Sequence, residues 1–243
     1  MSSTLLALET ATDVCSVALM QGDRVTVSLA LTRLRAHAET LAPLIQEALR
    51  YGGIAPRDLD GVAVSSGPGS YTGLRIGVST AKGLALAADA PLVAVPSLEA
   101  LAASVAPLAA PGEAVCALFN ARRHEVYAAV FLVAEKNILE ARAETAALRV
   151  DDVSGWLPEI KGRLWLVGEG APRVVSALED HLTGDVRLLD PSVFAPSATS
   201  VARLARPSLL GGQVEDVARF EPFYLQAFVA KTPQSSIFEK LPF

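Results

Sequence analysis

The sequence predicts an α/β fold made of two lobes that repeat one order of elements. In the first half, apolar runs and amphipathic spacing predict three strands, a helix, a strand and a helix, with a short strand and helix added. The second half repeats this order. Because 243 residues suffice for two modest lobes around real cores, the repetition implies a duplicated βββαβα unit with a cleft between its copies.

In the first half, short β-branched and aliphatic runs predict strands, and apolar residues three and four apart predict helices. The first helix has its apolar face formed by Leu41, Leu44, Ile45, Ala48 and Leu49, and Gly52-Gly53 ends it. The expected strands are 5–8, 15–20, 24–31, 62–65 and 92–95, and the expected helices are 37–51, 70–88 and 97–105.

In the second half the same patterns predict five strands and three helices. A helix at 151–157 is expected to be capped by Asp151 or Asp152, because a carboxylate accepts from the first amides of a helix. The expected strands are 113–119, 125–133, 139–147, 164–167 and 186–189. The other expected helices are 172–181 and one that begins at Ala198.

The order of elements is that of the actin-like ATPases and sugar kinases, the two-lobed ribonuclease H-like (ASKHA) fold. The segment 107–112 is rich in proline, alanine and glycine and is the expected hinge. The predicted first lobe is therefore 1–106, and the predicted second, degenerate lobe is 107–197. A helix at about 198–211 is expected to pack back on the first lobe, before an irregular tail at 212–243.

Composition limits the classes of function. Apolar residues make up 51% and charged residues 19%, and a mean hydropathy of +0.37 favours extensive burial or a partner surface. The net charge of -5 counts against an autonomous nucleic-acid binder. Cys15 and Cys116 stand alone in apolar runs, which predicts core thiols in a reducing compartment.

Neither a signal peptide nor a membrane span is expected. The first apolar run lacks a basic start and is interrupted by Glu9. The Ala-, Leu- and Val-rich stretch at 83–108 is broken by Asp89, Pro91 and Pro96 before it reaches the length of a bilayer. We therefore expect a cytoplasmic protein.

The segment 62–86 contains the clearest functional signal. Gly73, Gly77 and Ala81 recur every four residues and leave one helix face nearly flat, although each helical glycine costs about 1 kcal/mol relative to alanine. Such a face allows close approach either to the chain's own sheet or to a helix of another subunit, and both contacts can occur on different faces. The residues predicted to contact a partner are Tyr71, Gly73, Leu74, Gly77, Val78, Ala81 and Ala85, with Leu41 and Ile45 of the preceding helix.

The turns that hold phosphate in two-lobed ATPases are weak in this sequence. The turn at 9–13 has hydroxyls and carboxylates but no glycine, and in the turn at 120–124 Asn120 carries no charge to hold a metal ion. Solvated hairpin tips and a plain strand-to-helix turn at 168–170 explain these segments as well. The residues that would make weak nucleotide contacts are Thr10, Thr12, Arg122, Gly168 and Gly170.

No catalytic or metal-ligating residue is predicted. The histidines at 37, 124 and 181 are scattered, with no pair four residues apart, which argues against a histidine metal site or a catalytic dyad. A nucleophile elbow of the G-x-S-x-G type is absent from the sequence. The two-lobed plan is therefore that of an enzyme, without the residues of one.

Several segments resemble the TsaB (YeaZ) family. The opening at 6–19 resembles the first strands of that family, and the segment 66–84 resembles its signature. The resemblance continues at 95–101, 120–123, 125–127 and 222–225.

The resemblance implies a role in making threonylcarbamoyladenosine, the modified base beside the anticodon of tRNA. In that family TsaB is a non-catalytic scaffold that binds and activates its paralogue TsaD, which transfers the threonylcarbamoyl group, while TsaE supplies an ATPase cycle. The implied partners are TsaD as a heterodimer and TsaE, with a homodimer in isolation and tRNA bound only indirectly. No tightly bound cofactor is expected, and ATP or ADP at an interface shared in the complex is the open alternative.

Three positions of the chain differ from the residues found in TsaD or in the TsaB family. TsaD has a His-x-x-x-His metal pair where this chain has Ser97 and Leu101, and these side chains cannot replace two imidazoles. Asn120 stands where the family usually has Asp. The alternatives to a scaffold are an ATP-dependent small-molecule kinase or ATPase that uses the cleft, and a metallopeptidase, for which no residue set appears.

Overall fold

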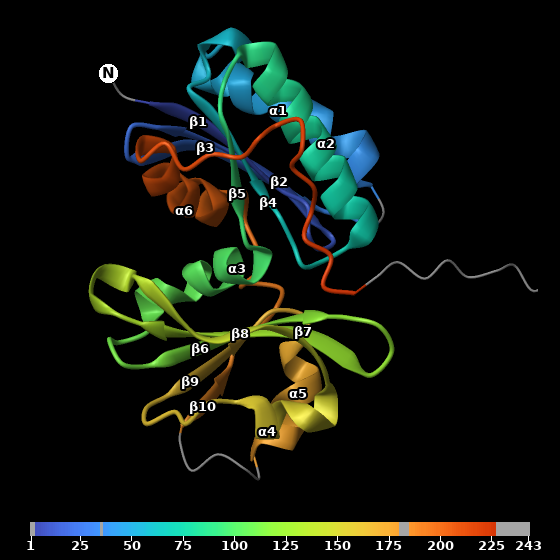
Figure 1. The fold of residues 1–243 in the computed structure, drawn as a ribbon, viewed down its shortest axis with the longest axis vertical. Helices are drawn as coiled ribbons and strands as arrows, with labels where there is room; N and C mark the ends of the chain where they lie inside the picture. The colour runs from blue at the N-terminus through green and yellow to red at the C-terminus, as the bar shows by residue number, and fades with distance from the viewer. Residues whose placement is uncertain (1–2, 35, 180–184, 227–243) are drawn as a thin grey trace, which may run out of the picture.

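The computed structural model describes residues 3–34, 36–179 and 185–226, and these form two sheets with helices between and around them (Figure 1). In Figure 1, α1 and α2 cover the outer face of the first sheet, α6 and α3 lie between the sheets, and α4 and α5 cover the outer face of the second sheet. The two lobes are thus stacked through a shared helical layer.

The first lobe is a five-stranded sheet in the order β3-β2-β1-β4-β5, with β1 antiparallel to β2 and parallel to β4. Its strands are β1 (Thr4–Glu9), β2 (Val14–Gln21), β3 (Arg24–Thr32), β4 (Gly61–Ser65) and β5 (Leu92–Val95). Its helices are α1 (His37–Gly52), α2 (Tyr71–Ala88) and α3 (Ser97–Val105), with short 3-10 turns η1 (Pro56–Asp58) and η2 (Ala106–Leu108).

The second lobe repeats the arrangement, in the order β10-β9-β6-β7-β8. Its strands are β6 (Ala114–Asn120), β7 (Glu125–Val133), β8 (Leu139–Arg149), β9 (Leu164–Val167) and β10 (Val186–Leu188). Its helices are α4 (Val153–Trp156) and α5 (Ala171–Glu179), with 3-10 turns η3 (Glu135–Asn137) and η4 (Val150–Asp152). The last helix is α6 (Ala198–Leu210), which packs on β1, β2, β4 and β5 of the first lobe.

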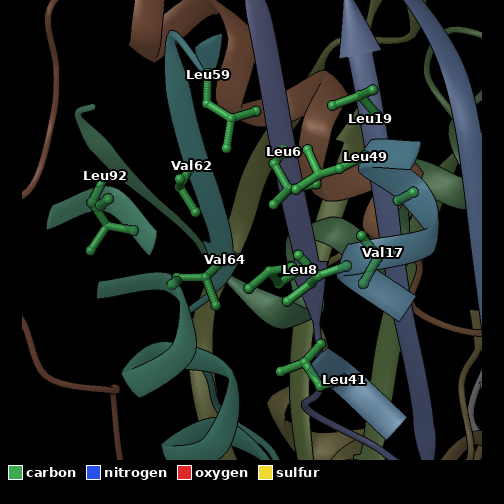
Figure 2. Packing of buried hydrophobic residues seen from close by; sticks show 14 of the residues in the cluster. Leu6, Leu8, Val17, Leu19, Leu41, Leu49, Leu59, Val62, Val64 and Leu92 are labelled. Carbon is green, nitrogen blue, oxygen red and sulfur yellow. The ribbon is translucent and has the colours of Figure 1, made fainter. Parts of the chain in front are cut away.

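Strand alternation distributes the apolar residues over both faces of each sheet. Leu6 and Leu8 of β1 pack toward α1 and α2, while Leu5 and Ala7 pack toward α6. Figure 2 shows the first of these clusters, in which strand residues meet Leu41 and Leu49 of α1. Both faces of the central strands are therefore buried, as the nearly continuous apolar runs of β1 and β4 require.

The structure differs from the sequence predictions mainly at the ends of elements. The helix predicted at 151–157 is a 3-10 turn followed by the four-residue α4. Its N-cap residue is Asp152, whose side chain makes no capping hydrogen bond, so the predicted capping by Asp151 or Asp152 is wrong. The predicted end of α5 at His181 lies outside the described residues, as does the tail beyond Gln226. Both cysteines are buried free thiols, and burial raises the pKa of Cys116 to about 12.

Candidate functional site

The glycine-bearing helix α2 begins against the turn between β1 and β2. The hydroxyl of Ser70 accepts from the amide of Gly73 at 3.2 Å and caps the helix, and the amide of Ser70 donates to the carbonyl of Ala11 at 2.7 Å. Because β1 and β4 run parallel, this turn and the start of α2 lie at the same edge of the first sheet. The first turn of α2 is therefore fixed to the chain that it follows.

The inner face of α2, which we define as Gly73, Gly77 and Ala81, lies on the chain's own β1–β2 turn. A Cβ atom at Gly73 would overlap the carbonyl oxygen of Thr10, and a Cβ at Gly77 would overlap the Thr10 hydroxyl. These two glycines are therefore required by close approach inside the chain. Of the two explanations offered for the flat helix face, close packing within the chain therefore applies to the inner face.

This geometry corrects the expected partner contacts. The structure places Gly73, Leu74, Gly77, Val78, Ala81 and Ala85 of α2 among the buried residues of this chain, together with Leu41 and Ile45 of α1. Buried side chains cannot reach a partner while the lobe keeps this fold. Tyr71 is the exception, since it is half-buried and its ring lies 4.9 Å from that of Tyr224.

The opposite side of α2 is solvent-exposed and uncharged over its second half. We define this outer face as Ser79, Gly83, Leu86 and Ala87, which are all exposed, with Leu86 at 70%. A Cβ at Gly83 would meet nothing within 4 Å, so no contact inside the described chain requires that glycine. The cost of about 1 kcal/mol for a helical glycine is therefore not offset there by packing within the chain.

The two charged side chains of α2 are both engaged within the chain. Arg75 donates to the Tyr71 hydroxyl at 2.8 Å. Lys82 donates to the carbonyl oxygens of Ala218 at 3.2 Å and Phe220 at 2.9 Å. These bonds direct the charges toward the N-terminal half of α2 and the C-terminal segment. The outer face is therefore left without a charged side chain.

Glu9 is a buried carboxyl group directly before Thr10, beneath the inner face. Its side chain is 0% exposed, and one of its oxygens accepts from the amide of Ala11. The other oxygen, and the hydroxyl of Thr10, make no hydrogen bond with any described residue. Burial raises the pKa of Glu9 to about 7. The hydrogen bond from the amide of Ala11 acts in the opposite direction and lowers this pKa, because it favours the charged form. The first residues of this turn, Glu9 and Thr10, are therefore buried, and Glu9 is a titratable group among them.

A cleft of about 280 Å³ lies between the carboxyl ends of the two sheets. The first lobe contributes the β1–β2 turn and the start of α2, and the second lobe contributes the β6–β7 turn and Glu169. A third wall comes from residues 223–226 of the C-terminal segment. The cleft predicted from the duplicated order is thus present, and one of its walls comes from the end of the described chain.

Arg173 of α5 holds the β6–β7 turn in place. Its guanidinium donates to Asn120 Oδ1 at 3.1 Å, to the Glu125 carbonyl at 3.0 Å and to the Arg123 carbonyl at 2.5 Å. The amide of Asn120 donates to Glu169 Oε1 at 3.2 Å, and partial burial raises the pKa of Glu169. Asn120 thus takes part in a network that fixes the turn.

The five predicted nucleotide contacts do not form one site. Thr12 and Arg122 line the cleft, whereas Thr10 faces α2. A Cβ at Gly168 would overlap the Leu118 carbonyl, and one at Gly170 would lie 2.9 Å from the Phe119 carbonyl, so close packing on β6 explains both glycines. Gly168 and Thr12 also line a second hollow of about 240 Å³. Of the five, only Thr12 and Arg122 therefore lie at the cleft between the lobes.

The positions that correspond to a metal-binding histidine pair have structural roles. Ser97 is fully buried and its hydroxyl accepts from the amide of Gly67 at 2.9 Å, and Leu101 lies in the core between the lobes. Across residues 3–34, 36–179 and 185–226, no group of three or more His, Cys, Asp or Glu side chains is placed to hold a metal ion. None of the helices in these ranges is both long and apolar enough to cross a membrane.

Three features were not predicted from the sequence: the buried Glu9, the role of Arg173, and the contacts of the C-terminal segment. Only the contacts of the C-terminal segment had a usable signal in the sequence. Lys82 is an isolated charge on an otherwise nearly uncharged helix, and such a residue needs a local acceptor. The others depend on contacts between residues far apart in the chain, which leave no local pattern.

Comparison with known proteins gives a consistent result. Residues 32–232 match the family model described as TsaD: tRNA N6-adenosine threonylcarbamoyltransferase. The chain is also 31% identical over 226 residues to the tRNA threonylcarbamoyladenosine biosynthesis protein TsaB of Escherichia coli strain K12. That match covers 93% of this chain and 96% of the E. coli protein.

Solved structures agree with the sequence matches. YeaZ from Pseudomonas aeruginosa superposes with a TM-score of 0.80 at 31% identity, covering 92% of this chain and 100% of that one. Component A of (R)-2-hydroxyglutaryl-CoA dehydratase from Acidaminococcus fermentans superposes with a TM-score of 0.50 at 11% identity, over 86% of this chain and 99% of that one. At 11% identity the likeness concerns the fold alone, and the predicted two-lobed actin-like architecture is confirmed.

Proposed function

The chain belongs to the TsaB (YeaZ) family of tRNA threonylcarbamoyladenosine biosynthesis proteins, and from this premise we propose that it is a non-catalytic partner of a TsaD transferase. In this role it binds TsaD and activates the transfer of the threonylcarbamoyl group to tRNA. The outer face of α2 is the surface proposed to contact TsaD.

The observation that supports this surface most directly is Gly83. Gly73 and Gly77 are accounted for by Thr10, whereas a Cβ at Gly83 would point into open space. The same exposed stretch includes Leu86 at 70% exposure, and the charges of α2 are held elsewhere by Tyr71 and by the carbonyls of 218 and 220. A helix of a partner could approach closely at Gly83 and bury Leu86. This contact would offset the cost of a glycine within a helix and that of an exposed leucine.

The absence of catalysis is part of the proposal and is supported by the residues at the positions of the histidine pair and by the packing of the β1–β2 turn. Ser97 and Leu101 are committed to the core, and the β1–β2 turn packs beneath α2. We propose no tightly bound cofactor for the chain alone, and we place any ATP or ADP at an interface shared within the complex. We also propose TsaE as a further partner. When TsaD is absent, we propose a homodimer formed through α1 and α2. Because the net charge is -5, tRNA would be bound mainly by TsaD.

The first experiment tests the pathway and the absence of catalysis together. Deleting the gene should remove threonylcarbamoyladenosine from bulk tRNA, and the purified chain alone should transfer nothing to unmodified tRNA. Transfer should appear when TsaD and its threonylcarbamoyl donor are added. Transfer by the chain alone would refute the non-catalytic role, and unchanged tRNA in the deletion strain would refute the role in the pathway.

The second experiment tests the surface with a matched pair of variants. Leu86→Asp places a charge on the outer face of α2, while Leu210→Asp places the same charge at the end of α6, where the leucine is 61% exposed. We expect Leu86→Asp to lose TsaD in co-purification and Leu210→Asp to retain it. Equal retention by two folded variants would show that TsaD does not bind here.

A small-molecule kinase or ATPase is the alternative that the cleft itself favours, because turns from both lobes face each other across it. Calorimetry with ATP and magnesium on the isolated chain separates the two proposals. Tight binding with turnover would favour the kinase, and its absence would favour the scaffold.

A further inference from the structure

The segment after α6, residues 215–226, crosses from the first lobe to the second. In Figure 1 it is the orange to red trace that passes β5, descends beside α2 and reaches the boundary between the lobes next to β7. We call residues 218–226 the strap. Just before the strap, the amide of Glu215 donates to the carbonyl of Leu92 at 2.8 Å, at the edge of β5. The strap has no helix or strand of its own, so its position depends on contacts with both lobes.

The first lobe binds the strap through main-chain groups. Lys82 holds the carbonyls of Ala218 and Phe220, and the amide of Phe223 donates to the carbonyl of Ser66 at 2.7 Å. The rings of Tyr224 and Tyr71 are in tilted contact, with their centroids 4.9 Å apart. These contacts attach the strap along α2 and the turn that precedes it.

Gly67 shows that the first lobe is shaped for this contact. Its φ of +111° is a conformation that favours glycine, and a Cβ there would overlap the carbonyl oxygen of Phe223. The amide of Gly67 is meanwhile bound to the Ser97 hydroxyl. The Gly-Pro-Gly turn therefore leaves room for the strap on one side and is fixed to α3 on the other.

The second lobe binds the far end of the strap through Gln226. Its amide nitrogen donates to Glu125 Oε2 at 2.8 Å, and the Tyr127 hydroxyl lies 3.5 Å from its amide oxygen. Both partners belong to β7, the strand that follows the cleft-lining β6–β7 turn. Residues 223–226 also line the cleft itself.

We propose that the strap is a latch, which bridges the mouth of the cleft and holds the two lobes at their closed angle. The lobes are also joined by a buried core that includes Leu98 and Leu101 of α3 and Phe119 of β6, which lines the cleft. A hinge in this core and a latch in the strap define a closed state. Releasing the latch would let the lobes rotate apart about the α3 layer and would admit a molecule to the cleft.

The latch is tested by measuring the distance between the lobes in the full-length protein. Spin labels are attached through Arg57→Cys in η1 and Asp151→Cys in η4, where the native side chains are 87% and 81% exposed. The native Cys15 and Cys116 are buried and compete little for the label. The closed state predicts one narrow distance distribution in this labelled parent, measured by double electron–electron resonance.

The latch variant combines Phe223→Pro, which removes the donor to Ser66, with Gln226→Ala, which removes the contacts to β7. Each hydrogen bond lost should raise the open population about fivefold, so longer distances should appear. The control is Arg219→Ala, since that side chain lies in the strap, is 89% exposed and pairs with Asp216. A latch variant with the same distribution as the control would overturn the proposal.

A charge exchange guards against a variant that merely misfolds. Gln226→Glu alone should open the lobes, because a carboxylate would face Glu125. Adding Glu125→Gln should restore the narrow distribution, since an amide then donates to a carboxylate in the reverse sense. If Glu125→Gln does not restore the narrow distribution that Gln226→Glu has broadened, the Gln226–Glu125 contact does not hold the lobes closed. That result would overturn the proposal.

Discussion

Gly77 and Gly83 lie in the same helix but in different surroundings. Gly77 faces Thr10, where any side chain would overlap the hydroxyl, while Gly83 faces solvent with nothing within 4 Å. One glycine is explained by the fold and the other is not. A spacing of small residues therefore indicates a close approach without showing whether the neighbour belongs to the same chain, and only the structure separates the two cases.

The largest expected effect concerns Glu9, beneath the inner face. Its folded pKa of about 7 exceeds the ordinary value of 4.5, so between these values the folded state holds a proton that the unfolded state has lost. The contribution of Glu9 to the free energy of unfolding is therefore fully present below pH 4.5. It falls by about 3 kcal/mol in all as the pH rises to 7. Glu9→Gln should abolish this part of the pH dependence in urea unfolding at pH 4.5 and pH 8. Parallel profiles for the variant and the wild type would contradict the burial of a titrating carboxyl there.

The next effect separates the two inner glycines. Gly77→Ala should lower the free energy of unfolding by about 2 kcal/mol, because the new methyl group overlaps the Thr10 hydroxyl. Thr10→Ala should restore most of this loss, since it removes that hydroxyl, which makes no hydrogen bond with a described residue. It should not rescue Gly73→Ala, where the overlapping atom is the main-chain oxygen of Thr10. Equal rescue of both variants, measured by urea unfolding, would show that the inner face is packed differently.

The outer face is tested by Gly83→Trp. The free energy of unfolding should stay within about 0.5 kcal/mol, because the position is exposed and unobstructed. Binding to TsaD in calorimetry should weaken about tenfold or more, since the ring would prevent close approach of a partner helix. A variant that binds like the wild type would remove Gly83 from the proposed contact.

The smallest effect is that of Gly83→Ala. Alanine loses less conformational freedom on folding than glycine, and the new Cβ meets nothing, so thermal unfolding should show a gain of about 0.5 to 1 kcal/mol. Gly77→Ala is the matched comparison, with the opposite sign expected. A loss of stability at both positions would mean that the two faces do not differ as described.

Most of the fold could be predicted from the sequence because the strands and helices have local patterns. The order of elements was confirmed, and boundaries such as Leu92–Val95 and Ser97–Val105 agree with the structure. The capping of α4 was predicted wrongly, because a 3-10 turn occupies the position of its first residues. Such an alternative to a first helical turn is not distinguished by the presence of aspartates alone.

The candidate site could be predicted only in part. The sequence analysis placed Gly73 and Gly77 at a partner contact, whereas in the structure they face Thr10 of the same chain. It also described 212–243 only as an irregular tail, and so did not predict what residues 218–226 contact. The strap is held by main-chain groups and single side chains from both lobes, and such contacts produce no periodicity in the sequence.

The packing of α6 has a consequence for how the chain folds during synthesis. The face of the first sheet that includes Leu5, Ala7 and Ala63 is covered by α6, which is translated only after the entire second lobe. At about 5–20 residues per second, the ribosome needs on the order of 10 s to pass from the end of α3 to the end of α6. Throughout that interval the first sheet has one apolar face without its helix. The nascent chain is therefore exposed to aggregation during this period, and chaperones that shield apolar surface would act on it then.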